Sequence, residues 1–547
     1  MKKNKKRGRP GPVLRFGIPT LIAVGIGSVG YRYLPQRLAA LQAVYPAPQE
    51  VVAGPVTIRV TGDPWSGYST FRGEPRLKEA LAKDRVTLAY LDDEKYYDQN
   101  ERMRALGAGE IDVALTTLDA FLQHGAKHRQ GKQYPGVILF GVDESAGGDA
   151  IFLAKGRKSF DEVTTADKVC FAEGTPSEHL WDFASLSFAA LESELEKRVG
   201  LVAEDCWKKL EAQEVQIAVL WQPFTAIAEK AGYPKVFATG GQADDVILDV
   251  LVANRNFVTK QRAALQKLTA AYFKTIAGYQ RDLDAHAAFI TSDCGPDCAG
   301  DKSLGRAVLS GIDFLTAEEN ACLWFGQCGK PNKLQPRVGK TGKLLIAKHK
   351  IDAAELPDAA SIVDDSFLLG LKTERERRAQ LAAEVAGPDA AGAAVAATTV
   401  EEARYRYMVP GAEDAAAGSG IGTLTLPPVF FSEGSYQLDA NAQNVVAVIA
   451  DKLRSFPAMC VRVTGYTNSK GDPAANKQLS KLRALVITQE LTRLDASAFP
   501  ANRFVVKGRG AEQPVLNAGN EDSRASRRTE FTLFECPGVP AAPGPTG

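Results

Sequence analysis

The chain has 547 residues, which is too many for one hydrophobic core, so two or three domains are expected. Hydrophobic residues make up 45% of the chain and charged residues 24%, as in ordinary globular proteins. The 66 Lys and Arg residues nearly balance the 65 Asp and Glu residues, and the net charge of +1 argues against nucleic acid as a partner.

A basic segment at the start of the chain precedes an uncharged one. Seven Lys and Arg residues lie within residues 1–15, whereas residues 16–31 have no charged side chain. Basic residues before an apolar segment keep the N-terminus in the cytoplasm. We therefore expect a basic cytoplasmic tail at 1–15 and a membrane anchor at 16–34, with a cleaved signal peptide as the alternative. Both interpretations export the rest of the chain.

Residues 52–372 alternate short apolar strands with helices. The first strand is expected at 57–61 and the second at 86–91, and a helix over 100–109 precedes a third strand at 111–115. Further strands are expected at 137–140, 151–154, 168–171 and 217–220. This sustained alternation predicts an α/β fold with mostly parallel sheets.

Five short motifs occur in order along this region. They are Asp63-Pro-Trp-Ser-Gly-Tyr68, residues 105–114, residues 143–150, Glu173-Gly-Thr-Pro-Ser177 and Val219-Leu-Trp-Gln-Pro223. In this order they resemble periplasmic solute-binding proteins of the nitrate/sulfonate/taurine type. The resemblance implies two lobes that close on a small molecule, which is held by loops at the ends of the strands.

The loops of this module contain the candidate ligand-binding residues. Aromatic side chains offer flat apolar walls, hydroxyl groups offer hydrogen bonds, and glycine lets backbone N–H groups approach a ligand closely. We predict a ligand site formed by Trp65, Ser66, Tyr68, Ser145, Gly148, Asp149, Thr175, Ser177 and Trp221.

The sequence leaves the charge of the ligand open. Thr175, Pro176 and Glu178 are typical of a helix start, with Thr175 as the N-cap. Thr175 either caps this helix alone or also contacts the ligand. A helix N-terminus favours an anion, whereas Asp149 repels one unless a proton is shared or a cation is bound.

Motifs of common enzyme classes do not occur in the sequence, which has no G-x-S-x-G, H-E-x-x-H or P-loop. Residues 25–30 match G-x-G-x-x-G, but a basic tail precedes them instead of a strand, so no dinucleotide is expected. His124 and His128 are four residues apart, yet their neighbours are typical of a solvated helix end and not of a metal site. We expect a binding protein, not an enzyme, with no cofactor or metal.

Eight cysteines in a chain that is expected to be exported predict disulfides. Cys170 and Cys206 flank one segment of the module and are candidates for one bridge. Cys460 begins a strand and Cys536 follows the last one, so a bridge is within reach if these strands are antiparallel neighbours. A loop-rich region contains the remaining four, for which a four-thiolate zinc site is the less favoured alternative: Cys294, Cys298, Cys322 and Cys328.

Composition divides the rest of the chain. Residues 373–421 are rich in Ala and Gly and poor in large apolar residues, which predicts a linker. Residues 537–547 are rich in Pro, Gly and Ala, which predicts a disordered tail. Residues 422–536 are left as a second, smaller domain.

Four motifs mark that second domain. Gly465-Tyr-Thr-Asn468 ends a strand, and Leu479-Ser-Lys-Leu-Arg-Ala484 lies on a helix; Gly508-Arg-Gly510 and residues 524–528 follow. They resemble the motifs of the OmpA-like peptidoglycan-binding domain, namely Gly-His-Thr-Asp, Leu-Ser-x-x-Arg-Ala, Gly-x-Gly and Arg-x-x-Asn-Arg-Arg. The periodicity of the helix predicts an apolar side formed by Leu479, Leu482, Val486, Ile487 and Leu494.

This resemblance implies a site for diaminopimelate in the peptidoglycan stem peptide. In the family, the Asp of the first motif meets the ammonium group and the Arg of the second meets the carboxylate. Here Arg483 is present and Arg528 matches the last motif, but Asn468 stands at the Asp position and Tyr466 at the His position. Because Asn468 makes no charge-assisted hydrogen bond, we expect weaker or altered binding to the wall.

The combined prediction is a single-pass inner-membrane protein of the Gram-negative envelope, with a two-lobed α/β module and a smaller α/β OmpA-like domain in the periplasm. It binds a small solute and the peptidoglycan stem peptide, and it acts in transport or sensing with a transporter or signalling partner. The alternatives are a purely structural envelope tether and an enzyme on a binding-protein fold.

Overall fold

The computed structural model describes residues 54–371 and 420–536, except for 193–194, 241, 244–245, 296–297, 299–300, 330, 370 and 433. The predicted cytoplasmic tail, the membrane anchor at 16–34, nearly all of the linker and the terminal tail therefore lie outside the described residues. Among the described residues, no helix is long and apolar enough to cross a membrane.

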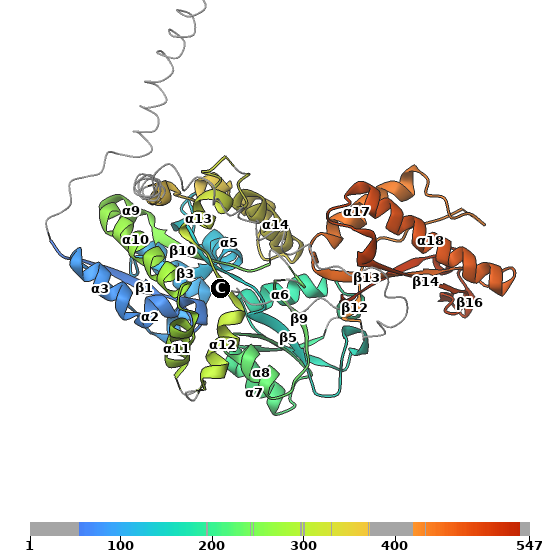
Figure 1. Cartoon of the computed structure of the whole chain (residues 1–547), viewed down its shortest axis with the longest axis horizontal. Coiled ribbons are helices and arrows are strands. Elements are labelled where there is room, and N and C mark those ends of the chain that lie inside the picture. The colour runs from blue at the N-terminus through green and yellow to red at the C-terminus, as the bar shows by residue number, and fades with distance from the viewer. Residues whose placement is uncertain are drawn as a thin grey trace, which may run out of the picture. The chain divides into compact units, whose positions relative to one another are not determined.

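Residues 54–371 form two lobes, each built around one β-sheet (Figure 1). The sheet of lobe 1 has the strand order β11-β4-β10-β3-β1-β2. Every residue of β3 and β10 is buried, which means that both faces of this sheet are covered. The strands are β1 (Val56–Thr61), β2 (Val86–Tyr90), β3 (Val113–Thr117), β4 (Gly136–Ser145), β10 (Leu248–Asn254) and β11 (Ile312–Phe314). The main helices are α2 (Ser69–Gly73), α3 (Pro75–Lys83), α4 (Gln99–Ala108), α5 (Leu118–Lys127), α10 (Arg262–Tyr279), α11 (Leu283–Cys294) and α14 (Leu334–Ala347).

The sheet of lobe 2 has the strand order β7-β6-β8-β5-β9. Its edge strand β7 is mostly exposed and contains three charged residues, 196–198, which discourage pairing with another chain. The strands are β5 (Asp149–Leu153), β6 (Lys168–Ala172), β7 (Glu196–Gly200), β8 (Ile217–Trp221) and β9 (Lys235–Ala238). The helices are α6 (Pro176–Ser185), α7 (Ala203–Glu211) and α8 (Phe224–Lys230), and α12 (Lys302–Ser310) packs against both α8 and α11.

Both sheets are mixed, so the prediction of mostly parallel sheets holds for only some of the strands. In lobe 1, β1 is parallel to β2 and β3, but β10 is antiparallel to β3 and β4. In lobe 2, β6 is parallel to β7 and β8, but β5 is antiparallel to β8 and β9. The antiparallel strands β5 and β10 are the two that the chain enters directly after it passes from one lobe to the other, without a crossover helix.

Residues 420–536 contain a four-stranded sheet with the order β12-β17-β13-β14. Strand β13 is parallel to β14 and antiparallel to β17. The buried guanidinium of Arg503 donates hydrogen bonds to the carbonyls of Leu453, Phe456, Met459 and Ala498, and so joins the connection before β13 to the connection before β14. The elements are β12 (Gly422–Thr423), α17 (Ala440–Leu453), β13 (Met459–Tyr466), α18 (Pro473–Leu494), β14 (Phe504–Gly510), β15 (Leu516–Asn517), β16 (Asn520–Glu521), α19 (Ser523–Ser526) and β17 (Thr529–Glu535).

The buried side of helix α18 overlaps only in part with the predicted one. Ile487 is buried as predicted and Leu479, Leu482 and Val486 are partly buried, but Leu494 is exposed. The other buried residues of the helix are Asn476, Ser480, Arg483, Ala484, Thr488 and Leu491. The reason is the close approach of the helix to glycines of the sheet: a Cβ on Gly465 would lie 2.1 Å from the carbonyl oxygen of Ser480. Only small side chains fit at this contact, so apolar periodicity alone does not identify the whole buried side.

The eight cysteines form four disulfides, Cys170–Cys206, Cys294–Cys298, Cys322–Cys328 and Cys460–Cys536. The two clustered pairs are thus bridged separately and do not form a four-thiolate zinc site. Cys460 lies on β13 and Cys536 directly follows β17, and these strands are antiparallel neighbours, as this bridge requires.

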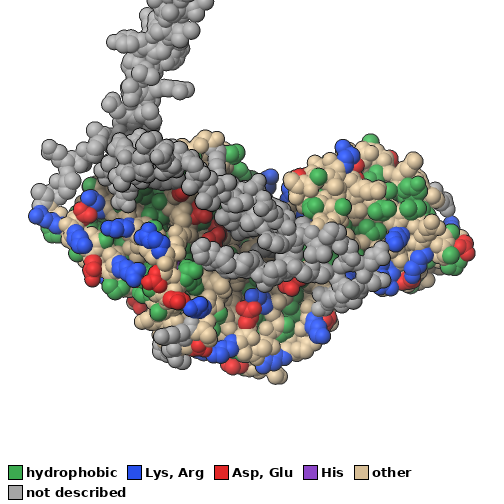
Figure 2. Space-filling model, in the orientation of Figure 1, with side chains coloured by type: hydrophobic (Ala, Val, Ile, Leu, Met, Phe, Trp, Pro, Cys, Tyr) green, Lys and Arg blue, Asp and Glu red, His purple; other side chains and the backbone are tan. Residues whose placement is uncertain are grey.

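The surface reflects the near-zero net charge. Lys and Arg side chains are interspersed with Asp and Glu side chains over the face shown in Figure 2. Many of these charges form short exposed ion pairs, such as Arg493 with Glu490 on α18. Pairs of this kind contribute little to stability, roughly 0–1 kcal/mol each.

We expect loss of the Cys460–Cys536 bridge to destabilise its domain more than loss of Cys294–Cys298 destabilises the region around it. The sequence separations of the two pairs are 76 and 4 residues. In the chain-entropy description, the longer loop contributes about 2–3 kcal/mol more to the free energy of unfolding. Urea denaturation of the full chain measures this difference when Cys460→Ser/Cys536→Ser and Cys294→Ser/Cys298→Ser are compared. Equal losses contradict the prediction.

Candidate functional site

The chain passes between the two lobes twice, and the two crossings are hydrogen-bonded to each other. The first crossing links β4 to β5, and the second links β9 to β10. The hydroxyls of Ser145 and Thr239 lie 2.7 Å apart, and Ser145 also accepts a hydrogen bond from the backbone N–H of Asp149. The N–H of Thr239 donates to the carbonyl of Asp149 at 3.0 Å. These bonds hold the ends of both sheets together at one place.

Two buried carboxyl groups lie beside these crossings in lobe 1. Asp143 on β4 and Asp249 on β10 are partners in the strand register. Burial raises the pKa of both groups well above the usual range, and the charge of Asp143 raises the pKa of Asp249 further. The indole N–H of Trp65 donates to Asp143 at 3.3 Å, and the hydroxyl of Tyr68 donates to Asp249. Trp65 and Tyr68 are therefore hydrogen-bond donors as well as the apolar walls that we expected.

Asp149 begins β5 and lies opposite Trp221 of β8 in the register. It is almost fully buried, and burial raises its pKa to about 7, with further increases from the charges of Asp119 and Asp63. Asp119 belongs to the first turn of α5 in lobe 1. Carboxyl groups from both lobes thus interact electrostatically at the crossings.

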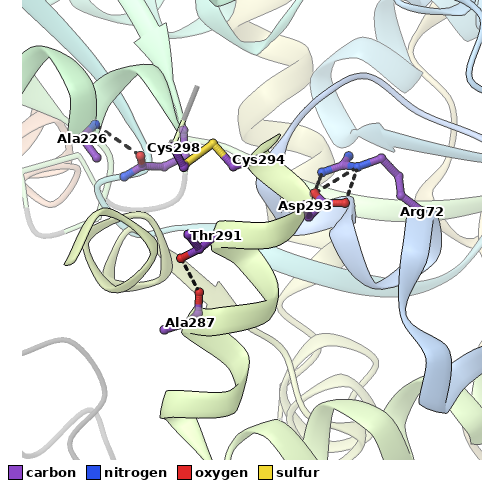
Figure 3. Close-up of a disulfide and its surroundings, with 8 residues drawn as sticks. Arg72, Ala226, Ala287, Thr291, Asp293, Cys294 and Cys298 are labelled. Atoms are coloured by element: carbon purple, nitrogen blue, oxygen red, sulfur yellow. Dashed lines mark hydrogen bonds and ion pairs between the residues drawn. A yellow bond between two sulfur atoms is a disulfide. The ribbon is translucent and has the colours of Figure 1, made fainter. Parts of the chain in front are cut away.

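The loop after β1 is fixed by two arginines. The buried Arg102 donates to the carboxylate of Asp63 at 3.1 Å. Arg72 donates to the carbonyls of Asp63 and Trp65 at 3.1 and 2.8 Å, and it pairs with Asp293. Figure 3 shows this ion pair beside the Cys294–Cys298 disulfide at the end of α11. The disulfide thus lies next to the carboxylate that orients Arg72 toward the loop.

Helix α5 of lobe 1 follows β3, and helix α6 of lobe 2 follows β6. The two helix starts differ in whether a side-chain hydroxyl caps the helix. Thr175 caps α6: its hydroxyl accepts from the N–H of Ser177 at 3.3 Å and donates to the carbonyl of Ala172 at 2.7 Å. The hydroxyl of Ser177 is buried without a hydrogen-bond partner in the described chain. Thr117 at the start of α5 makes no side-chain cap, and its buried hydroxyl is also unpartnered there.

The predicted ligand-binding residues are all placed at these loops and strand ends, and the eight with side chains are buried: Trp65, Ser66, Tyr68, Ser145, Asp149, Thr175, Ser177 and Trp221. The ninth, Gly148, packs so closely that a Cβ there would lie 2.6 Å from the ring of Trp65. Within this set, the hydroxyls of Thr175 and Ser145 are engaged in the hydrogen bonds described above, whereas that of Ser177 is not.

Sequence reasoning missed four residues of this region, Thr117, Asp119, Asp143 and Asp249. A signal was present for two of them: Asp143 and Asp249 are acidic residues within otherwise apolar strands. Carboxyl groups are rarely buried unless they are paired or functional, so this placement is informative. For Thr117 and Asp119 the sequence has no such signal, because their position depends on how α5 meets lobe 2.

The two histidines do not form a solvated helix end. His124 is buried, and its Nε2 lies 2.8 Å from the carbonyl oxygen of Gly174 in lobe 2. Burial lowers the pKa of His124 to about 4, so the ring is neutral at pH 7. His128 contacts Asn100 instead, at 3.0 Å. Among the described residues, no group of three or more His, Cys, Asp or Glu side chains is arranged to hold a metal ion.

The second candidate site lies on α18 and is built around Arg483. Its guanidinium is almost fully buried, donates to the carbonyls of Ser435 and Ser432 at 2.9 and 3.2 Å, and lies over the ring of Phe431. Its Nη1 has no hydrogen-bond partner in the described chain. Burial, together with the charge of Arg527, lowers the pKa of Arg483 to about 10. This is a buried cation without a carboxylate within ion-pair distance among the described residues.

The other residues predicted for this site have different surroundings. Asn468 is 7% exposed and follows Thr467, whose buried hydroxyl has no partner in the described part of the chain. Arg528 pairs with Glu530 at 2.7 Å and lies over the ring of Tyr466. Arg528 and Tyr466 therefore stack on each other at the end of the sheet, and Arg527 is the arginine that interacts electrostatically with Arg483.

Solved structures that resemble the two-lobed region include solute-binding proteins. The alkanesulfonate-binding protein SsuA of Xanthomonas axonopodis pv. citri is 12% identical with a TM-score of 0.43, over 57% of this chain and 99% of that chain. The periplasmic nitrate-binding protein NrtA of Synechocystis PCC 6803 is 11% identical with a TM-score of 0.42, over 57% of this chain and 86% of that chain.

Curated relatives match the C-terminal part of the chain. The probable lipoprotein YiaD of Escherichia coli is 29% identical over 137 residues, which are 24% of this chain and 61% of that protein. The peptidoglycan-binding protein ArfA of Mycobacterium tuberculosis is 27% identical over 116 residues, which are 21% of this chain and 35% of that protein. The matched part thus spans less than two thirds of either relative. Residues 430–528 match the model of the OmpA family, so this long chain carries an OmpA domain at its C-terminus.

Proposed function

We propose that this protein is an envelope protein that binds a small solute between the two lobes of residues 54–371 and attaches to peptidoglycan through its C-terminal domain. One observation supports both halves: each candidate site contains buried polar atoms for which the described chain supplies no partner. Leaving such atoms unpaired is unfavourable, and they are found mainly where a ligand or water completes the hydrogen bonds.

The proposed solute binding is supported by the connection between the lobes. Two crossings tied at Ser145 and Thr239 form a hinge about which two rigid sheets can close on a ligand. The buried hydroxyls of Thr117 and Ser177 belong to helices of different lobes and remain available to a ligand. Binding without turnover is the activity that we propose, because these buried hydroxyls are suited to hydrogen-bond a solute.

The proposed attachment to peptidoglycan is supported by Arg483. A buried guanidinium with a vacant N–H donor suits a carboxylate, which it can hold through two parallel hydrogen bonds. Diaminopimelate in the stem peptide carries such a carboxylate, and the relative ArfA is described as peptidoglycan-binding. Asn468 accepts a hydrogen bond without a charge, so the carboxylate end of the ligand is held more firmly than the ammonium end.

We further propose that residues 16–34 anchor the protein in the inner membrane, and that the solute module serves transport or sensing at the envelope.

Thermal denaturation of the purified full chain with a panel of anions, sulfonates, amines and nucleobase precursors tests solute binding. A rise in Tm with one compound, without its consumption, supports the proposal. Product formation instead favours an enzyme, and the absence of any effect favours a structural tether.

Arg483→Met is expected to abolish binding to purified sacculi while leaving the thermal stability unchanged or slightly higher. The substitution removes the carboxylate-binding group and also a cation that is buried without a counter-ion. Co-sedimentation of the full chain with sacculi measures binding. Arg493→Ala, on the exposed side of the same helix, is the matched control and should bind normally.

Asn468→Asp is expected to strengthen sacculus binding, because a carboxylate adds a charge-assisted hydrogen bond to an ammonium group. The gain should be largest at low salt, where charge interactions are least screened. Co-sedimentation at two salt concentrations measures it. No gain at either concentration would show that this position does not face the stem peptide.

Ser177→Ala and Thr175→Ala are expected to differ in their effects on the free energy of unfolding. Thr175→Ala removes the cap of α6 and should lower the free energy of unfolding by about 1 kcal/mol. Ser177→Ala removes a buried hydroxyl that has no partner, so the unliganded protein should be no less stable, while solute binding weakens. Denaturant titration separates the two variants, and a stability loss of equal size in both contradicts the assignment.

A further inference from the structure

We propose that the solute bound between the lobes is an organic cation with an ammonium group, which is held by the carboxylates of Asp119 and Asp149. This inference rests on the proposed solute-binding function and names the chemical class of the solute. Asp119 is on α5 of lobe 1 and Asp149 begins β5 of lobe 2, so an ammonium ion between them would be held by both lobes.

The cationic side chains around the crossings already have carboxylate partners. Arg102 pairs with Asp63, Arg72 pairs with Asp293, and Lys350 pairs with Glu178. Arg337 lies 3.9 Å from Glu144. Each of these cations thus has a carboxylate within ion-pair distance, whereas neither Asp119 nor Asp149 forms an ion pair with a cation of the described residues.

The carboxylate of Asp119 still has a vacant acceptor position. Asp119 is 3% exposed, and its Oδ1 has no hydrogen-bond partner in the described chain. Asp149 interacts with Ser145, and its other electrostatic neighbours are the acidic groups Asp119 and Asp63. An ammonium group supplies three donors and a positive charge, whereas an anion would be repelled by both carboxylates.

The N-termini of α5 and α6 do not reverse the preference of the site for a cation. Each already contains an acidic residue in its first turn, Asp119 on α5 and Glu178 on α6. Glu178 accepts a hydrogen bond from the backbone N–H of Gly174 and pairs with Lys350. The positive ends of the helix dipoles are thus directed at carboxylates of the chain, which leaves them less able to attract an anionic ligand.

The aromatic residues beside these carboxylates favour an organic cation over a metal ion. Trp221 lies opposite Asp149 in the register, and the Trp65 ring packs at Gly148, the residue before Asp149. Aromatic faces attract ammonium groups and also cover their apolar substituents. The acidic side chains of the described residues are not arranged as a metal site.

The proposal implies a pH dependence centred on Asp149. Burial raises its pKa to about 7, against the effect of the hydrogen bond from Ser145, and the charges of Asp119 and Asp63 raise it further. Asp143 and Asp249 are its other acidic neighbours. Below pH 7 Asp149 is mainly neutral and attracts an ammonium ion less, so affinity should fall as the pH falls. If only the ionised form binds, affinity decreases about tenfold from pH 8 to pH 6.

The test uses the full chain and three probes of similar length, butylamine, butane-1-sulfonate and pentanoate, at equal ionic strength. Tm and tryptophan fluorescence are measured at pH 6 and pH 8. We expect butylamine to raise Tm in a saturable manner, about tenfold more tightly at pH 8. Asp119→Asn and Asp149→Asn should each lose this response, whereas Asp84→Asn, an exposed carboxylate that pairs with Lys267, should keep it.

The outcomes separate this inference from the proposed function. Binding of the sulfonate or pentanoate without binding of butylamine overturns the cation assignment and leaves solute binding intact. Butylamine binding that persists in Asp119→Asn and Asp149→Asn, with circular dichroism unchanged, overturns the assignment of these residues. If no probe shifts Tm or fluorescence at either pH, both the cation assignment and solute binding are contradicted.

Discussion

The two-lobed module depends on the joint between its two chain crossings. Ser145 and Thr239, one from each crossing, share a hydrogen bond of 2.7 Å, and the backbone of Asp149 bonds to both residues. Because the crossings are tied together, the lobes have one pivot, and the strand ends that meet there have fixed positions. This constraint places Asp249 close to Asp143 and Asp149, although it is far from both in the sequence.

The same constraint explains why so much charge can be buried at this place. The carboxyl groups differ in their partners: Asp63 pairs with Arg102, Asp143 accepts a hydrogen bond from Trp65, and Asp149 interacts with Ser145. Among the described residues, neither Asp119 nor Asp149 forms an ion pair with a cation, and these two groups come from opposite lobes. A ligand that stabilises these two groups also stabilises the contact between the lobes, which couples binding to closure.

The sequence predicts local features of the fold well and long-range ones less well. The Thr175 cap and the strands β1 to β6 and β8 follow from patterns within short segments. Strands β7, β9, β10 and β11 are not predicted, and the direction of β5 and β10 depends on where the chain crosses between lobes. The buried side of α18 is predicted only in part, because Ser480 and Arg483 are buried by contacts that hydrophobicity does not measure. Asp119 is missed as well, since no local pattern marks its burial.

The two candidate sites have opposite charge. The candidate site of the C-terminal domain contains a buried cation, Arg483, and Asn468 takes the position of the Asp in the OmpA-like motif. The candidate site between the lobes contains the buried carboxylates of Asp119 and Asp149. A carboxylate that suits Arg483 is repelled between the lobes, and an ammonium group that suits the lobes gains nothing at Arg483. In our proposal, different chemical groups therefore select the wall and the solute. One chain can then hold both at once without the two ligands competing for either site.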